Sequence, residues 1–190
     1  MARKRRYEDE EELDKPNTRP ARIAVIGRPN VGKSTLFNRM AGKKLAIVND
    51  TPGVTRDVRE TKSRLRGHDM TLMDTAGFEN ATGDKLEARM RSQTEEAVLG
   101  ADILLFVYDA REGVTPLDRI FAEFVRKQGK PTVLVANKCE SGAADSGVNE
   151  GYSLGMGDPV EVAAEHNIGM VDLDDAVDLA LRDVKLGNRP

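Results

Sequence analysis

The sequence predicts an α/β protein with a doubly wound, mostly parallel sheet between layers of helices. Short apolar runs, rich in β-branched residues and bounded by polar residues, recur along the chain, and such runs are typical of strands buried on both faces. Segments with helical apolar spacing lie between them. Strand and helix in alternation require right-handed crossovers and place a site at the carboxyl ends of the strands. The predicted strands cover residues 23–26, 70–73, 103–108 and 132–136.

Each helix is predicted from apolar residues three and four positions apart, which form the face that packs on the sheet. The first pattern begins at Leu36, directly after the first predicted strand and its connecting loop. The third is preceded by Thr115 and Pro116, with Asp118 three residues after Thr115. This is a capping arrangement with proline at the first helical position. The helical patterns cover residues 36–41, 86–98, 117–125 and 170–181.

Composition excludes several classes of protein. The 190 residues carry 29 Lys and Arg against 32 Asp and Glu, a net charge of −3. A domain that binds nucleic acid mainly through its phosphates normally has a strong excess of basic residues, so a dedicated nucleic-acid binder is not expected. A single cysteine excludes a disulfide framework and fits a reducing compartment. No apolar run reaches the roughly 18 residues of a membrane helix, so we expect no membrane partner.

The predicted organisation is a charged leader, one domain and a short tail. Residues 1–20 contain a basic run at Arg3 to Arg6, an acidic block behind it and almost no large apolar side chain. Such a segment cannot bury enough surface to offset its ordering entropy, so we expect disorder. The basic run is either a nucleic-acid contact or part of a solvated leader. The domain spans 21–185, and residues 186–190 form a tail or the start of an interdomain linker.

A phosphate-binding loop is predicted between the first strand and the first helix. Glycines let the backbone N–H groups point inward, and the helix N-terminus adds positive potential for a β-phosphate. Lys33 can reach the β- and γ-phosphate oxygens, and the Ser34 hydroxyl can ligate Mg²⁺. The loop, Gly27-Arg28-Pro29-Asn30-Val31-Gly32-Lys33-Ser34 followed by Thr35, matches the pattern G-x-x-x-x-G-K-[ST].

Two further segments are expected to complete the phosphate and metal site. Asp74-Thr75-Ala76-Gly77 follows the second predicted strand, which places Asp74 to hold Mg²⁺ through water. The Gly77 backbone N–H would meet the γ-phosphate and sense the nucleotide. Thr55, in a polar stretch between the first helix and that strand, is the candidate for a hydroxyl that completes the metal shell only when the γ-phosphate is present.

The segment Asn137-Lys138-Cys139-Glu140 follows the last predicted strand and is expected to select the base. A carboxylate there accepts from guanine N1–H and the exocyclic amine, whereas adenine offers a lone pair and a C–H. The stem of Lys138 would pack along the base, and Cys139 would fill core space as a small apolar side chain. Farther along, the Ala164 backbone N–H, beside Glu165, could meet the guanine carbonyl oxygen.

Together these residues resemble the Ras-like GTPases of the translation-factor-related class, and within it the EngA/Der family of bacterial ribosome-assembly GTPases. The resemblance covers about residues 22–183 and is to the first GTPase domain of that family. It rests on the segments 27–38, 50–57, 74–79, 109–113 and 152–157.

The resemblance implies a three-layer P-loop NTPase fold of the Ras-like G-domain type, with a six-stranded sheet and one antiparallel edge strand. It implies GTP and GDP as ligands, Mg²⁺ as cofactor, and hydrolysis of GTP. It also implies a cytoplasmic bacterial protein that associates with the large ribosomal subunit and its RNA. The family carries a second GTPase domain and a KH-like domain that this chain lacks, so an isolated first domain or a fragment is expected.

Three departures from the family pattern bear on mechanism. Glu140 stands where most GTPases have Asp, so guanine reading should persist with altered geometry, and Ala163 replaces a Ser that would brace the next loop. Phe78 lies where Ras-type enzymes have the glutamine that orients the attacking water, and Phe cannot make that hydrogen bond. Related GTPases with an Asn at the position of Asn30 use a potassium ion beside the β- and γ-phosphates, so we expect slow turnover that K⁺ stimulates through Asn30.

Alternatives remain open from the sequence. The chain could be a switch that hydrolyses GTP, a GTP-gated binding module with negligible turnover, or an Era-like or tRNA-modification GTPase. The stretch from Arg56 to Arg66 contains five basic residues and two acidic ones. This stretch is either an edge strand protected by charge or a surface for RNA or a neighbouring domain.

Overall fold

The computed structural model describes residues 19–42, 59–75 and 84–184. Within these ranges a six-stranded sheet has the order β2-β3-β1-β4-β5-β6. The pair β2 and β3 is antiparallel, and the other neighbouring strands are parallel. The expected mostly parallel sheet with one antiparallel edge strand is therefore confirmed. The strands are β1 (Ala21–Ile26), β2 (Arg59–Leu65), β3 (His68–Asp74), β4 (Ile103–Asp109), β5 (Thr132–Asn137) and β6 (Val160–Glu161).

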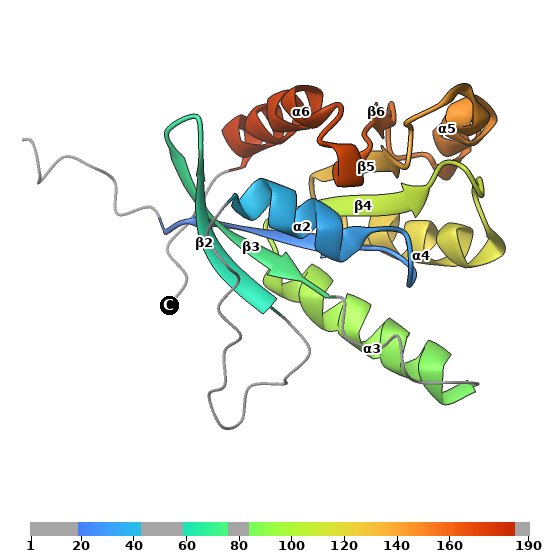
Figure 1. Cartoon of the computed structure of the whole chain (residues 1–190). Helices are drawn as coiled ribbons and strands as arrows, with labels where there is room; N and C mark the ends of the chain where they lie inside the picture. The colour runs from blue at the N-terminus through green and yellow to red at the C-terminus, as the bar shows by residue number, and fades with distance from the viewer. Residues whose placement is uncertain (1–18, 43–58, 76–83, 185–190) are drawn as a thin grey trace, which may run out of the picture.

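The helices form layers on the two faces of the sheet (Figure 1). On one face α2 and α6 pack against the strands, and on the other face α3 and α4 do so. The helices are α2 (Lys33–Ala41), α3 (Asp84–Gly100), α4 (Pro116–Lys127), α5 (Asp145–Gly151) and α6 (Met170–Asp183), with 3-10 turns at Gly142–Ala144, Tyr152–Leu154 and Ala164–His166. None of the helices within these described ranges is both long enough and apolar enough to cross a membrane.

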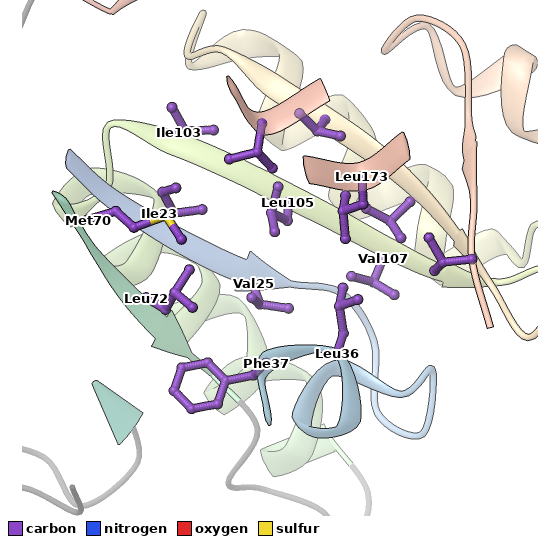
Figure 2. Packing of buried hydrophobic residues seen from close by; sticks show 14 of the residues in the cluster. Ile23, Val25, Leu36, Phe37, Met70, Leu72, Ile103, Leu105, Val107 and Leu173 are labelled. Carbon is purple, nitrogen blue, oxygen red and sulfur yellow. The ribbon is translucent and has the colours of Figure 1, made fainter. Parts of the chain in front are cut away.

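Strand β4 shows how one apolar run fills both halves of the core. Ile103, Leu105 and Val107 belong to the cluster under α2 and α6, and the residues between them belong to the cluster under α3 and α4. All seven residues of β4 are buried, because a strand with helices on both sides alternates its side chains between two apolar layers. Figure 2 shows the first cluster, where Leu36 and Phe37 of α2 meet Val25, Leu72 and Leu105.

Two elements were not predicted as separate segments from the sequence. Helix α5 contains two glycines in seven residues, and its buried residues are Gly147, Val148 and Gly151. With a single large apolar side chain among them, the helix has no apolar stripe to predict it. Gly147 is required there, since an added Cβ would lie 1.8 Å from the Ala110 carbonyl oxygen. Strand β6 has two residues, which is too short for a periodic signal. Both elements border the loops that follow β4 and β5.

The chain order of the strands decides where a ligand can bind. From β1 the chain crosses to β2 and β3 on one side of β1 and later to β4 on the other. Ligand sites of open α/β sheets lie outside the carboxyl ends of the strands at such a reversal. The carboxyl ends of the parallel strands β1, β3, β4 and β5 all lie at this edge.

Candidate functional site

The loop between β1 and α2 is built around two glycines. Gly27 has φ +148°, and an added Cβ would lie 2.3 Å from the carbonyl oxygen of Val107. Gly32 has φ +96°, and its added Cβ would lie 2.2 Å from Nδ2 of Asn137. Only glycine fits either position without displacing its neighbours. The predicted phosphate loop therefore lies directly against β4 and β5.

Lys33 folds back over this loop. Its Nζ donates to the carbonyl oxygen of Arg28 at 2.7 Å, and the residue is only 7% exposed. This places the ammonium inside the curve of the loop, at the N-terminus of α2. A lysine held there beside backbone N–H groups is suited to contact phosphate oxygens as a positive charge.

Ser34 and Asp74, which the sequence predicts as residues of a metal site, lie in contact with each other. The Ser34 hydroxyl donates to Oδ2 of Asp74 at 3.1 Å, and Asp74 is fully buried. Parallel pairing of β1 and β3 aligns Asp74 with Val25, and the Thr75 hydroxyl donates to the Val25 carbonyl at 2.9 Å. A hydroxyl and a carboxylate are hard oxygen ligands, so these residues fit Mg²⁺ held by one or two protein oxygens and several waters.

Arg59, which the sequence analysis did not assign to the site, lies on the same pair. Its Nη2 donates to Ser34 Oγ at 3.0 Å and to Asp74 Oδ2 at 3.1 Å. The only sequence signal was its place in the basic stretch before the second predicted strand. Four other predicted site residues lie outside the described residues: Thr55, Ala76, Gly77 and Phe78.

Asn137 joins the phosphate loop to the loop that carries Ala164. Its Nδ2 donates to the Val31 carbonyl at 2.8 Å, and its Oδ1 accepts from the Ala164 backbone N–H at 3.1 Å. From the other side, Nε of Arg39 donates to the Ala164 carbonyl at 2.8 Å. The Asn137 side chain, which the sequence predicts in the base site, thus fixes the phosphate loop, the Ala164 loop and its own loop relative to one another.

The Lys138 side chain contacts both the phosphate loop and the last residue of β4. It adopts φ +68°, and its Nζ donates to the Asn30 carbonyl at 2.9 Å and lies 2.8 Å from Oδ2 of Asp109. Burial acts to raise the pKa of Asp109, but the hydrogen bond from Lys138 and the backbone N–H groups of Glu112 and Arg111 outweigh it. The pKa of Asp109 therefore lies below its usual range.

Glu140 and Ala164 border one pocket at this edge of the sheet. Within it, Nη1 of Arg111 lies 3.2 Å from Oε1 of Glu140, so the predicted base-reading carboxylate is paired with a cation from the loop after β4. A larger pocket of about 380 Å³ lies between α3 and α4, and the described residues that line it belong to none of the sequence motifs. The pocket around Glu140 is lined by Gly32, Thr35, Arg111, Asn137, Lys138, Glu140, Ala163, Ala164 and Glu165.

Cys139 lies between Lys138 and Glu140 in sequence, and its side chain packs against the core. Its backbone N–H donates to the Val162 carbonyl at 3.0 Å, and its partly buried side chain packs against the cluster under α3 and α4. Burial, and then the charge of Glu161, raise the pKa of its thiol to about 11. A thiol in this position is protonated at neutral pH, as expected of a side chain that only fills space.

Arg28 connects the phosphate loop to α4. Its Nη2 lies 2.5 Å from Glu112 Oε2, and its Nε lies 3.4 Å from each carboxylate oxygen of Asp118. The hydrogen bond from Nε to Oδ2 of Asp118 is long and therefore weak, and charge attraction adds to it. Glu112 belongs to the segment 109–113, on which the family resemblance partly rests. The contact of Asp118 with Arg28 had no signal in the sequence, where Asp118 was predicted only as part of a helix cap.

The family model described as 50S ribosome-binding GTPase matches residues 22–138. The chain belongs to this family of GTPases. The matched residues include the phosphate loop, the Ser34 and Asp74 pair, and Asn137 with Lys138. This GTPase domain is 56% identical over 159 residues to GTPase Der of Rhizobium etli, an alignment that covers 84% of this chain and 34% of the relative. It is 59% identical over 155 residues to GTPase Der of Nitrobacter winogradskyi, covering 82% and 34%. The domain therefore spans about one third of the length of these curated relatives.

Solved GTPase structures share the fold of this domain. A variant of Aquifex aeolicus Era bound to GDP and aluminium fluoride has a TM-score of 0.68 and 26% identity, covering 88% of this chain and 58% of that one. Era in complex with MgGDPNP and a segment of 16S ribosomal RNA has a TM-score of 0.68 and 27% identity, covering 92% and 60%. The predicted Ras-like, P-loop GTPase fold is confirmed.

Proposed function

We propose that this domain binds GTP with Mg²⁺, hydrolyses it, and acts as a switch in assembly of the large ribosomal subunit. The observation that carries the nucleotide assignment is the double contact of Asn137 with Val31 and Ala164. It holds the phosphate loop beside the loop that would meet the base. The two halves of a nucleotide site therefore share one rigid edge of the sheet.

The phosphate half supplies fixed positive potential. Lys33 would leave the Arg28 carbonyl for the β- and γ-phosphate oxygens, while the loop N–H groups and the α2 N-terminus contact the β-phosphate. Ser34 would ligate Mg²⁺, and Asp74 would accept hydrogen bonds from its waters. When bound, the metal neutralises charge that develops on the phosphate oxygens. Thr55 and Gly77 are proposed to contact the metal and the γ-phosphate.

The base half would read guanine through Glu140 and Ala164. Glu140 would accept two donors from guanine and find none on adenine, and an acceptor that a bound base covers without pairing costs about 1–3 kcal/mol. In the structure the Glu140 carboxylate is held by Arg111 at 3.2 Å. This contact orients a side chain that is one methylene longer than the aspartate usual in GTPases.

Turnover is proposed to be slow and stimulated by K⁺. Phe78 offers no hydrogen bond to an attacking water, so positive charge beside the phosphates has to come from elsewhere. Asn30 adopts φ +65° at the outer turn of the phosphate loop, and its side-chain oxygen is the proposed K⁺ ligand. The cation would stabilise charge that develops between the β- and γ-phosphates.

We propose ribosome association and a cytoplasmic location on the similarity to relatives alone. The matching family is described as ribosome-binding, and the Era structure contains ribosomal RNA. The other domains of the longer relatives would contribute to any such contact. The large subunit is the proposed partner because the family description names the 50S subunit. The Era structure holds 16S RNA and supports contact with ribosomal RNA only.

The test is binding and hydrolysis of GTP, GDP and ATP with Mg²⁺, in KCl and in NaCl at equal ionic strength. We expect GTP and GDP to bind at least 100-fold more tightly than ATP, in line with sites built to hydrogen-bond a substrate group. Phosphate release from GTP should be faster in KCl, and Asn30→Ala should remove that difference. Tight ATP binding would contradict the guanine assignment. Equal rates in both salts would remove the K⁺ proposal, and no turnover at all would leave a GTP-gated binding module.

A further inference from the structure

Arg59 is the first residue of β2 and contacts both oxygen atoms that are proposed to serve the metal. Its Nη2 lies 3.0 Å from Ser34 Oγ and 3.1 Å from Asp74 Oδ2, and these two oxygens lie 3.1 Å from each other. The three atoms form a closed triangle of hydrogen bonds. A single guanidinium nitrogen thus bridges the hydroxyl and the carboxylate.

The sheet register explains why this arginine reaches the pair. Arg59 lies directly opposite Asp74 in the antiparallel pairing of β2 and β3, and directly opposed residues point their side chains to the same face. The Asp74 side chain is fully buried, whereas that of Arg59 is 34% exposed. The guanidinium therefore reaches in from solvent and can leave along the same route.

We propose that Arg59 competes with Mg²⁺ for Ser34 and Asp74, so that loading of the metal displaces the guanidinium into solvent. Mg²⁺ holds its ligands at about 2.0–2.1 Å in a near-octahedral shell that retains several waters. The Ser34 lone pair that accepts from Arg59 and the Asp74 oxygen beside it are needed for the metal and its waters. Two cations at one oxygen pair also repel each other. This inference rests on the proposed Mg²⁺ site and adds that its affinity is set partly by the first residue of β2.

The test compares Arg59→Gln with Arg64→Gln. Arg64 lies on the same strand and carries the same charge, but its guanidinium lies 3.8 Å from Asp69 and both side chains are at least 70% exposed. The measurement is the dissociation rate of fluorescent GDP across a range of free Mg²⁺ set with EDTA. The half-effect concentration is the free Mg²⁺ concentration at which the GDP dissociation rate lies halfway between its values without Mg²⁺ and at saturating Mg²⁺. Arg59→Gln should lower this concentration roughly five- to tenfold, within the usual range for two coupled binding events. Arg64→Gln should leave it at the wild-type value.

A second variant, Arg59→Lys, tests the inference if Arg59→Gln does not fold. Arg59→Lys keeps the charge, but an ammonium on a flexible stem is less well oriented to bridge two oxygens, so the half-effect concentration should fall by a smaller factor. In both variants an unchanged or raised half-effect concentration would overturn the inference. If GDP release from the wild-type domain does not depend on Mg²⁺, the proposed metal site itself fails.

A thermal measurement gives an independent readout. Without Mg²⁺, Arg59→Gln should melt at a lower temperature than Arg64→Gln, because buried Asp74 loses a charged donor. With GDP and Mg²⁺ the gap between the two variants should narrow, since the metal replaces that charge. A gap that is equal with and without Mg²⁺ would mean that Arg59 and the metal act independently, which contradicts the competition.

Discussion

At the scale of single residues, the buried Asn137 and the partly exposed Lys138 show how polar groups organise the proposed site. Asn137 is 3% exposed and satisfies both ends of its amide with backbone groups from two other loops. Lys138 reaches the outer turn of the phosphate loop and the Asp109 carboxylate. Buried polar groups that are fully paired hold a unique arrangement, whereas a half-paired group would be costly. These two neighbours therefore hold together the loops that are proposed to bind the phosphates and the base.

Cys139 gives a prediction at the residue scale. With its pKa raised from 9.0 to about 11 by burial, the thiolate fraction near pH 8 is about 100-fold smaller than that of an ordinary cysteine. We expect alkylation by iodoacetamide to be slower than in the urea-unfolded chain by about that factor, and to accelerate as the pH rises toward 11. Mass spectrometry of the intact chain measures it, since Cys139 is the single cysteine. Equal rates in folded and unfolded chains would contradict the burial argument.

At the scale of elements, the start of α4 links helix capping to the phosphate loop. Thr115 and Asp118 form a capping box, in which the Thr115 hydroxyl accepts from the Asp118 backbone and the Asp118 carboxylate accepts from the Thr115 backbone at 2.9 Å. The same carboxylate is fully buried beside the guanidinium of Arg28. The first turn of α4 thus holds both its own backbone and Arg28 of the predicted phosphate loop.

The variant Asp118→Asn tests this link. The amide keeps the size of the side chain but loses the charge that faces Arg28 and weakens the cap. Loss of a cap and of a charge-assisted contact each cost about 1 kcal/mol, so urea unfolding should show a decrease of roughly 1–3 kcal/mol. Glu123→Gln on the same helix is the matched control. Its 3.2 Å ion pair with Lys127 is largely exposed, so the change should stay below about 0.5 kcal/mol. Equal effects of the two variants would show that Asp118 has no special role.

At the scale of the whole molecule, a doubly covered sheet fixes the loops at one edge. Strands β1, β4 and β5 are almost entirely buried, with side chains in both core clusters. Helices α2 and α6 close one face, and α3 and α4 close the other, as Figure 1 shows. Close packing transmits any shift in the sheet to the attached loops. The stability of the core and the geometry of the nucleotide site are therefore coupled.

Leu105→Ala measures the contribution of this core. Leu105 is fully buried at the centre of β4, within the cluster of Figure 2. Removal of its side-chain atoms leaves a cavity and should lower the free energy of unfolding by about 2–5 kcal/mol. Leu179→Ala is the control, since Leu179 is 62% exposed on α6 and should change stability by less than about 0.5 kcal/mol. Denaturant unfolding gives both values, and a similar loss for the two leucines would contradict the assigned core.

Much of the fold was predictable because buried strands and amphipathic helices leave local patterns. All four predicted apolar runs are strands, each extended in the structure by one to three residues, and the capping box at Thr115 is present. Helix α5 and strand β6 gave no such signal. Two glycines weaken the helical pattern of α5, and Gly147 is there for a close backbone approach that depends on packing.

The sequence was enough to predict a phosphate loop, a metal pair and a base-reading segment, because each motif is contiguous and follows a recognisable strand. The contacts that hold these groups in place are visible only in the folded chain. Asn137 meets Val31 across 106 residues of sequence, Arg28 meets Asp118 across 90, and Arg59 reaches Ser34 because β2 pairs with β3 in one register. A sequence pattern reports local conformation and the face that is buried. Contacts between distant side chains arise from strand order and register, which are set by packing of the whole chain.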